Sequence, residues 1–273
     1  MNPKIDILTL GVRDVDQARQ FVERGFGAAV QPEDEALAIT LGPNSSRVHL
    51  RAWDEVAFDA GVESVSRGFR AFTLSYILES ADAVDAVLAG VERHGGRVCK
   101  PPKSAFWGYS AYVTDPSGFL WKIASAKRRP LLGRKEPAAG YGQAARPKEV
   151  PITIGVADMK RSKEFYRDGL GLQVKKAFGN KFVMFEGQDG TSDLGMYKRE
   201  ALAEDAGVPP EGSGFHGFSI THAVRSPTEV DALLARAADA GGQVVRPARE
   251  DGRGYCGYFA DLDGNLWQAA TRN

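Results

Sequence analysis

Short apolar runs recur along both halves of the chain and predict strands. The runs are rich in β-branched and aliphatic residues, are four to eight residues long, and are bounded by turn-forming residues. In the first half they predict strands at 5–12, 37–41, 47–51, 72–78, 109–114 and 119–124. In the second half they predict strands at 152–156, 182–186, 194–198 and from 218 onward.

Helical periodicity fills the gaps between some of these strands. Asp14 is a candidate N-cap with Gln17 three residues later, and the apolar positions that follow lie on one helical face up to Gly25. Ser226 opens another helix, with Pro227 at its first position and Glu229 as capping-box partner. Similar patterns predict helices before Gly95-Gly96, over 158–169, and before Gly241-Gly242.

The two halves repeat one another. Segment 68–74 (GFRAFTL) returns as 214–220 (GFHGFSI), and 115–121 (DPSGFLW) returns as 261–267 (DLDGNLW), 146 positions later in both cases. A nearly constant offset over a half-chain indicates duplicated domains. Within each half the element order also repeats, about 66 residues apart. We therefore predict an α+β fold of four β-α-β-β-β modules, with domains at 1–125 and 149–273.

The segment between these domains, 126–148, has no periodicity and is rich in Pro, Gly and basic residues, which is typical of a linker. A nucleic-acid-binding arm is the alternative, but interleaved aromatics are missing beyond Tyr141. The whole chain has 35 basic and 35 acidic side chains. This balance argues against a nucleic-acid or membrane surface, and no apolar run approaches the roughly 20 residues that span a bilayer.

Cys99 and Cys256 occupy non-equivalent positions in the two halves, so we expect no disulfide. Two unpaired thiols are typical of a reducing compartment, and the N-terminus has no signal-peptide pattern. We therefore expect a cytoplasmic protein.

The order of these motifs resembles a known family. A strand followed by Asp (10–14 and 154–158), the helix end FYRDGLG (165–171) and the hairpin Asp-x-x-Gly-x-x-Trp look like the vicinal oxygen chelate superfamily. That superfamily includes glyoxalase I, bleomycin resistance proteins and extradiol dioxygenases. The resemblance covers nearly all of both halves. It implies two tandem glyoxalase-like domains, in which paired modules form curved mixed sheets around a cleft.

The resemblance also implies where metal ligands would lie, namely at the first and last strands of each module. A site for Zn²⁺ or Fe²⁺ needs about three protein ligands, usually with a carboxylate or several imidazoles. The corresponding positions do not supply them, so we expect no cofactor and keep a divalent metal as the alternative, with His216 and Gln268 as the weak candidates. The positions are Ile7 and Pro151, Lys122 and Gln268, His49 and Gly195, and Arg70 and His216.

Individual histidines and Cys256 give little further chemistry. His94 falls in the last turn of a helix, where an imidazole favours the helix dipole. His49 is either a cleft-lining residue or a solvated strand residue. Cys256 has no evident base, so packing is the better interpretation.

Aromatic residues are the positive signal for ligand binding. Trp and Tyr combine apolar area with a polar tip, which suits a pocket for a planar or amphipathic molecule. Each one also has an alternative role in the core, and because the two halves differ at several of these positions, their clefts should differ in specificity. The candidate ligand-binding residues are Trp53, Arg70, Phe72, Trp107, Tyr109, Tyr112, Trp121, His216, Phe218, Tyr255, Tyr258 and Trp267.

The leading hypothesis is a protein, similar in role to drug-sequestering resistance proteins, that binds a small aromatic or amphipathic molecule without a complete metal site. A metal-dependent lyase, isomerase or dioxygenase of the same superfamily is the first alternative, and a non-catalytic structural or interaction module is the second. The expected partner is a small molecule, with no nucleic acid and no membrane. Four modules in one chain favour a monomer with an internal pseudo-dimer, with a homodimer as the alternative.

Overall fold

A computed structural model describes residues 4–106, 108–129 and 145–271. In the first half, one module contains β1 (Ile7–Val12), α1 (Val15–Phe21) with a π-helical end η1 (Val22–Phe26), β2 (Val30–Glu33), β3 (Ala36–Ile39) and β4 (Arg47–Ala52). The next contains β6 (Phe72–Leu78), α3 (Ala81–Arg93), β7 (Arg97–Ala105), β8 (Gly108–Thr114) and β9 (Leu120–Ser125).

The second half repeats this order. Its first module contains β10 (Ile152–Val156), α4 (Met159–Glu164) with η2 (Phe165–Gly169), β11 (Val174–Phe178), β12 (Phe182–Phe185) and β13 (Leu194–Lys198). Its second contains β15 (Phe218–Val224), α6 (Pro227–Asp239), β16 (Gln243–Asp251), β17 (Gly254–Ala260) and β18 (Leu266–Thr271).

The helix starts follow from the predicted caps. Asp14 Oδ1 accepts a hydrogen bond from the Gln17 amide at 2.9 Å, and Ser226 Oγ accepts one from the Glu229 amide at 3.3 Å. His94 is the C-cap of α3. The sequence patterns did not predict the strands β2, β7, β11 and β16. In each half they also missed a helix and a short strand that lie between its modules. They are the helices α2 (Trp53–Ala60) and α5 (Arg199–Ala206) and the short strands β5 (Ser66–Gly68) and β14 (Gly212–Gly214).

Each sheet combines one module from each half of the chain. The first sheet has the order β16-β17-β18-β15-β1-β4-β3-β2, and the second has the order β11-β12-β13-β10-β6-β9-β8-β7. The halves meet through antiparallel pairs, β1 with β15 and β6 with β10, and β5 pairs with β14. The predicted α+β class with mixed sheets is confirmed. The first sheet combines the first and last modules of the chain, and the second sheet combines the two middle modules.

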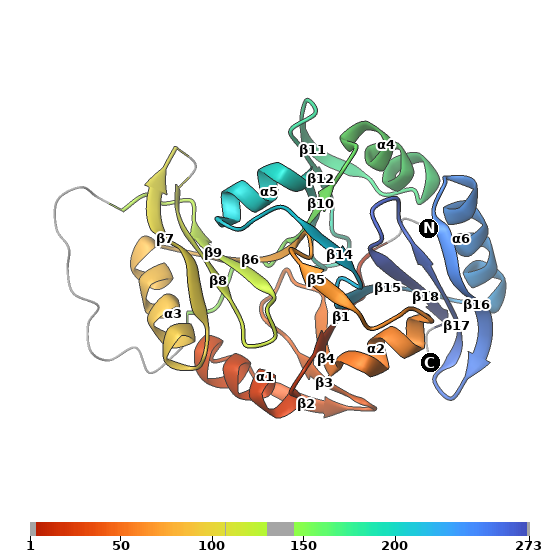
Figure 1. The fold of residues 1–273 in the computed structure, drawn as a ribbon, viewed down its shortest axis with the longest axis horizontal. Coiled ribbons are helices and arrows are strands. Elements are labelled where there is room, and N and C mark those ends of the chain that lie inside the picture. Colours follow the sequence, from red (N-terminus) through yellow and green to blue (C-terminus); the bar gives the residue numbers. More distant parts are fainter. Residues whose placement is uncertain (1–3, 107, 130–144, 272–273) are drawn as a thin grey trace.

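The helices divide between the two faces of each sheet. In the first sheet α1 packs on β4, and α6 packs on β16, β17 and β18. Helix α2 packs instead on the opposite face, where Trp53 and Val56 join a cluster with Tyr258 and Leu266. Helix α5 holds the equivalent place on the second sheet. In Figure 1, α2 and α5 lie on either side of the central β5–β14 pair.

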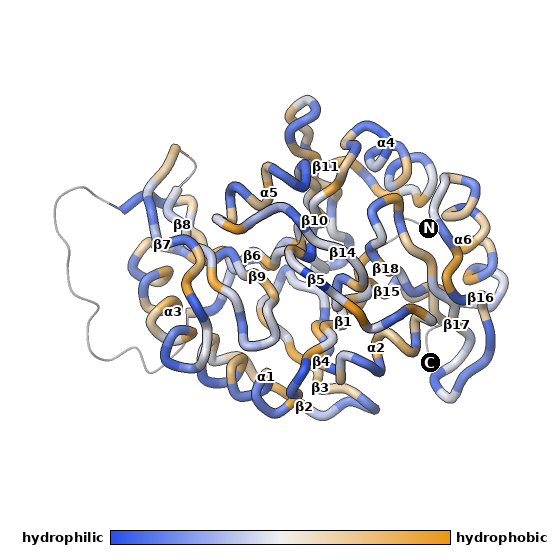
Figure 2. Tube along the Cα trace, viewed as in Figure 1, coloured by the Kyte–Doolittle hydropathy of each residue, from blue (hydrophilic) through white to orange (hydrophobic). Residues whose placement is uncertain are grey.

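The core follows the helix-covered faces of both sheets. Figure 2 shows apolar residues along the strands and inner helix faces, with hydrophilic segments at many turns and outer helix surfaces. Phe72 and Phe218, from different sheets, meet at the centre of the molecule with ring centroids 4.2 Å apart. Cys99 and Cys256 are free, as expected. Among the described residues, no helix is long and apolar enough to cross a membrane.

Candidate functional site

A cavity of about 370 Å³ lies on the α2-covered face of the first sheet. Side chains alternate between the faces of a strand, so alternate residues of four neighbouring strands form its floor. Because β1 and β4 belong to the first half and β15 and β18 to the second, both halves build this cavity. The lining includes Ile7, Thr9, Glu33, Asp34, Glu35, Ala36, His49, Arg51, Val56, Asp59, Ser219, Thr221, Ala223, Asp251, Arg253, Cys256, Tyr258, Gln268, Ala270 and Thr271.

The floor carries uncharged hydrogen-bonding groups. Thr9 is 8% exposed and Ser219 is 3% exposed, and they stand opposite one another in the β1–β15 pair. Beside them, Thr221 donates its hydroxyl to Gln268 Oε1 at 2.8 Å. The Thr9 and Ser219 hydroxyls have no hydrogen-bond partner within the part of the chain that the structure describes. Both hydroxyls line the cavity, where they can donate to and accept from a water or a ligand.

His49 lines the cavity from β4, which decides between the two interpretations that the sequence left open. Its Nε2 is 3.4 Å from Glu33 Oε1. Burial lowers the pKa of His49 to about 4, and the charges of Arg47 and Arg51 act in the same direction. The imidazole is therefore neutral at neutral pH.

The mouth of the cavity is a network of charged groups around Asp59. Arg51 Nη1 is 2.5 Å and Arg253 Nη2 is 2.6 Å from Asp59 Oδ2. Glu35 Oε2 lies 3.3 Å from both guanidinium groups. Burial acts to raise the pKa of Asp59, but the hydrogen bonds from Arg51 and Arg253 outweigh it and hold the pKa below its ordinary value.

Cys256 lines the cavity next to this network. Its thiol donates to Asp251 Oδ2 at 3.2 Å. Burial and the neighbouring Asp251 raise the pKa of the thiol to about 11. The thiolate is the reactive form, so a nucleophilic role at neutral pH is disfavoured.

The donor set of the cavity does not fit a resident divalent metal. Of the positions that the resemblance assigns to metal ligands, the cavity contains Ile7, His49 and Gln268. Ile7 has no donor atom, and the Gln268 carbonyl oxygen already accepts a hydrogen bond from Thr221. Across the described ranges, no three His, Cys, Asp or Glu side chains form a group that could hold a metal ion. About three such ligands are needed.

The equivalent face of the second sheet has a different arrangement. Asp205 of α5 stands 146 positions after Asp59, and its Oδ2 accepts a hydrogen bond from Lys122 Nζ at 2.7 Å and another from the Tyr112 hydroxyl. Lys122 occupies the position that Gln268 has in the first sheet. A partly exposed ion pair therefore occupies the place that the Gln268 amide has in the first sheet.

A smaller cavity of about 200 Å³ lies beside Arg70. The Arg70 guanidinium is 4.6 Å from the ring centroids of both Trp53 and Phe119, and it donates to the Ser117 carbonyl at 2.8 Å. Burial lowers the pKa of Arg70 to about 10. In the repeat its place is taken by His216, whose Nδ1 lies 2.9 Å from Asn265 Oδ1 and whose pKa is lowered by burial.

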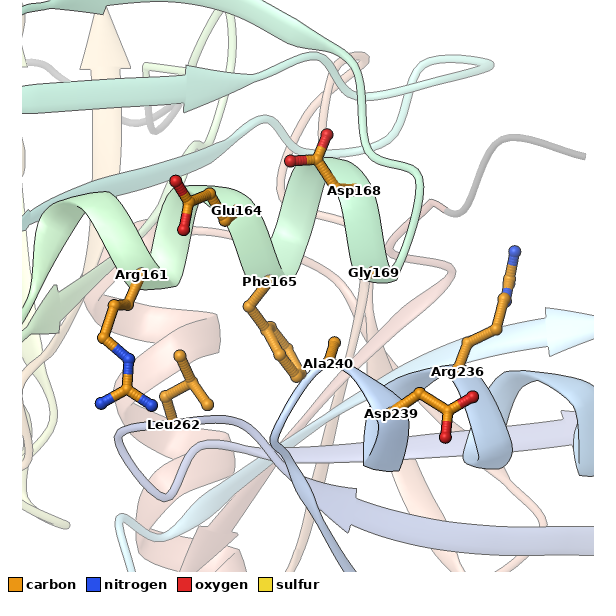
Figure 3. Close-up of a pocket in the computed structure, with 9 residues that line it drawn as sticks. All are labelled: Arg161, Glu164, Phe165, Asp168, Gly169, Arg236, Asp239, Ala240 and Leu262. Atoms are coloured by element: carbon orange, nitrogen blue, oxygen red, sulfur yellow. The ribbon is translucent and has the colours of Figure 1, made fainter.

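A third depression, of about 420 Å³, is an open groove between α4–η2 and α6. Figure 3 shows the Phe165 ring at its centre, with Arg161 and Leu262 on one side and Arg236 and Asp239 on the other. Its charged side chains are exposed and can be hydrated. Among the described residues, the groove has no buried polar atom without a hydrogen-bond partner, whereas the cavity of the first sheet has two, His49 Nε2 and Arg51 Nε.

The residues singled out from the sequence fall in several environments. Tyr258 lines the main cavity, and Arg70 and Phe72 line the smaller one. His216 and Gln268 have different hydrogen-bond partners, Asn265 and Thr221, and Gln268 lines the main cavity whereas His216 is not among its lining residues. Trp107 lies outside the described residues.

The other aromatic candidates pack in the core or donate hydrogen bonds to carboxylates. Trp121, Trp267 and Phe218 belong to the main core, and Trp53 packs against Phe215 at the start of α2. Tyr109 and Tyr255 donate to Asp85 on α3 and Asp231 on α6, and Tyr112 donates to Asp205. Their role in ligand binding stays a prediction.

The floor residues Thr9, Ser219 and Thr221 were missed by the sequence analysis. The available signal was a small polar side chain at alternate positions of otherwise apolar strands. On β15 that pattern is Ser219, Thr221 and Ala223 between Phe218, Ile220 and His222. On a strand, such alternation marks the face that is not packed in the core.

Comparison with known families agrees with this architecture. The model of the glyoxalase/bleomycin resistance protein/dioxygenase superfamily matches residues 4–123 and 150–269. The chain belongs to this superfamily. The two matched segments give the tandem arrangement that the repeat predicted, and the resemblance noted in the sequence is confirmed.

Solved structures of this superfamily share the fold over the whole chain. Glyoxalase I from Zea mays is 18% identical, with a TM-score of 0.65 over 99% of this chain and 92% of that chain. A putative dioxygenase from Bacillus subtilis is 14% identical, with a TM-score of 0.62 over 99% of this chain and 86% of that chain. A comparison with curated protein sequences gave no match. At these identities the similarity establishes the fold and leaves the chemistry to the site.

Proposed function

We propose that this superfamily member binds a small amphipathic molecule in the cavity of the first sheet, without a resident metal ion. The observation that carries the proposal is the pair of Thr9 and Ser219 hydroxyls, which face a cavity of about 370 Å³ and have no hydrogen-bond partner among the described residues. Cavities of a few hundred Å³ that place hydrogen-bonding groups beside apolar side chains are typical of small-molecule sites.

The walls supply the apolar part of the match. Ile7, Val56 and the Tyr258 ring stand around the hydroxyls, and Gln268 adds an amide on the adjacent strand. A hydroxyl both donates and accepts, so the floor suits a ligand with an uncharged hydroxyl, carbonyl or amide group. Each hydrogen bond to such a group contributes about 0.5–1.5 kcal/mol, which sets orientation, while apolar contact supplies the larger share of affinity.

The test is a fragment screen by ligand-observed NMR, followed by titration of variants. Thr9→Val and Ser219→Ala remove each hydroxyl with little change of shape. We expect the hits to bind about tenfold more weakly to each variant, as the loss of one hydrogen bond predicts. Equal binding to wild type and to both variants would overturn the proposal.

The second sheet offers a matched control. Thr153 is the repeat equivalent of Thr9, and it stands opposite Thr73 as Thr9 stands opposite Ser219. Thr153→Val should leave binding unchanged. If Thr153→Val loses binding and Thr9→Val keeps it, the ligand binds at the second sheet and our assignment to the first-sheet cavity is wrong.

A separate measurement tests the proposal that the cavity has no resident metal ion. Protein purified without chelator should contain far less than one equivalent of Zn, Fe, Mn or Ni, and EDTA should not change fragment binding. Near-stoichiometric metal would contradict the donor set described above and favour the metal-dependent alternative.

A further inference from the structure

We propose that Asp59 is the specificity-determining residue of this cavity, because its carboxylate occupies Arg51 and Arg253 and so excludes anionic ligands in favour of neutral or cationic ones. This inference rests on the proposed function, since it specifies the class of small molecule that the cavity takes.

The two guanidinium groups that line the cavity already have carboxylate partners. Asp59 Oδ2 lies 2.5 Å from Arg51 Nη1 and 2.6 Å from Arg253 Nη2. Glu35 Oε2 lies 3.3 Å from each of them, and Glu55 is 3.6 Å from Arg51. Arg51 Nε has no hydrogen-bond partner, but this atom is buried. An anionic ligand would therefore have to displace one of these carboxylates to reach the terminal nitrogen atoms of either arginine.

Asp59 is held in place by its helix. Val56 and Ala60 of α2 are buried in the cluster with Tyr258, which fixes the helix against the sheet. Arg246 donates to the backbone carbonyl of Asp59 from β16, so the end of α2 is tied to the sheet as well. The Asp59 side chain is only 14% exposed. The carboxylate therefore belongs to a packed element and is a fixed part of the cavity wall.

The charges of the whole lining act in the same direction. The carboxylates of Glu33, Asp34, Glu35, Asp59 and Asp251 outnumber the guanidinium groups of Arg51 and Arg253. His49 contributes no positive charge at neutral pH. A lining with this excess repels an entering anion and attracts a cation.

The repeat shows the same carboxylate with different partners. Asp205, the equivalent of Asp59, accepts from Lys122 and Tyr112 and lies 3.6 Å from Lys100 Nζ. Lys122 and Lys100 stand at positions that differ from those of Arg51 and Arg253. Helix α5 nevertheless places a carboxylate beside them. In both sheets, therefore, a carboxylate from the covering helix, α2 or α5, neutralises cations on the face that this helix covers.

The experiment compares three probes of one size and different charge, namely benzoate, benzamide and benzylammonium, by NMR titration at pH 7. Wild type should bind benzamide and benzylammonium more tightly than benzoate. Asp59→Asn keeps the shape and removes the charge, so benzoate should gain about tenfold and benzylammonium should lose a similar factor. The control Asp205→Asn should change neither in the first-sheet cavity, as read from chemical shifts around Tyr258.

Two results would overturn the inference: benzoate that binds wild type as tightly as benzamide does, or benzoate affinity unchanged by Asp59→Asn. Sulfate separates this inference from the proposed function, because it needs no contact with the floor. If no organic probe binds wild type, the proposed function fails, while sulfate binding gained in Asp59→Asn still supports the role of Asp59. If Asp59→Asn does not fold, Glu35→Gln at the rim releases the same arginines in part and must show a smaller gain of benzoate.

Discussion

Arg253 and Asp59, 194 positions apart in the chain, meet at 2.6 Å across the mouth of the cavity. Asp59 lies in the last turn of α2, the helix between the two modules of the first half, and Arg253 stands at the β16–β17 turn of the last module. The contact exists because the sheets combine modules from opposite halves. The cavity therefore needs residues from both halves of the duplicated chain.

Arg253→Ala should lower the free energy of unfolding by about 1–2 kcal/mol, since it removes a charged hydrogen bond that is partly shielded from solvent. Arg51 remains to compensate Asp59, which limits the loss. Urea denaturation monitored by circular dichroism measures it. Arg249→Ala, on β16 and exposed, is the control and should cost no more than about 0.5 kcal/mol. An equal loss in both variants would show that the contact with Asp59 adds no stability.

His49→Gln should flatten the dependence of stability on pH below neutrality. The unfolded imidazole titrates near 6.5, whereas burial lowers the folded pKa to about 4. Between these values the unfolded state binds the extra proton, so wild-type stability falls as pH falls from 6.5 to 4. The complete effect is up to about 3 kcal/mol.

Urea titrations at pH 7, 6, 5 and 4.5 check the His49 prediction. Relative to wild type, His49→Gln should gain stability at each lower pH. Ser219→Ala, in the same cavity but without a titratable group, should keep a constant difference from wild type. A constant difference for His49→Gln as well would mean that folding does not lower the pKa of the imidazole.

The local elements could be predicted from the sequence, and the pairing of modules could not. Strand composition, the caps at Asp14 and Ser226 and the hairpins at Asp115 and Asp261 depend on neighbouring residues, and all of them are confirmed. The choice of β15 as the partner of β1 depends on contacts between distant segments. Either pairing of modules would bury the same apolar faces, so the pattern along one strand does not decide between them.

The candidate site was predicted less well for a geometric reason. Trp121 and Trp267 attract attention as large aromatics, yet they face the helices and pack in the core, and the next residues, Lys122 and Gln268, point to the other face. A shift of one residue along a strand changes the face. Helix α2, which carries Asp59, is only eight residues long, so its periodicity was too short to be recognised beside the strand before it.

Cys256 should report on occupancy of the cavity. With a pKa near 11, its thiolate fraction at pH 8 is about a hundredfold below that of a thiol with a pKa near 9. In a Cys99→Ser background, iodoacetamide should therefore label folded protein far more slowly than urea-unfolded protein.

Asp251→Asn should speed the labelling of Cys256, because it removes the carboxylate that accepts a hydrogen bond from the thiol. A fragment that fills the cavity should slow it further, and labelling that is insensitive to every fragment hit would place those hits elsewhere.

Gly217→Ala should be among the most destabilising single substitutions. Gly217 has φ of 84°, in the left-handed region, and a Cβ there would overlap the Trp53 ring, whose Nε1 donates to the Ser64 carbonyl. Left-handed strain and overpacking together predict a loss of about 2–4 kcal/mol.

The repeat provides the reciprocal variant, because the equivalent residue is Ala71, with φ of 51°. Ala71→Gly relieves the strain and deletes a buried methyl group, so its stability should stay within about 1 kcal/mol of wild type. Thermal and urea denaturation of the two variants measure the contrast, and similar losses in both would refute the steric role assigned to Trp53.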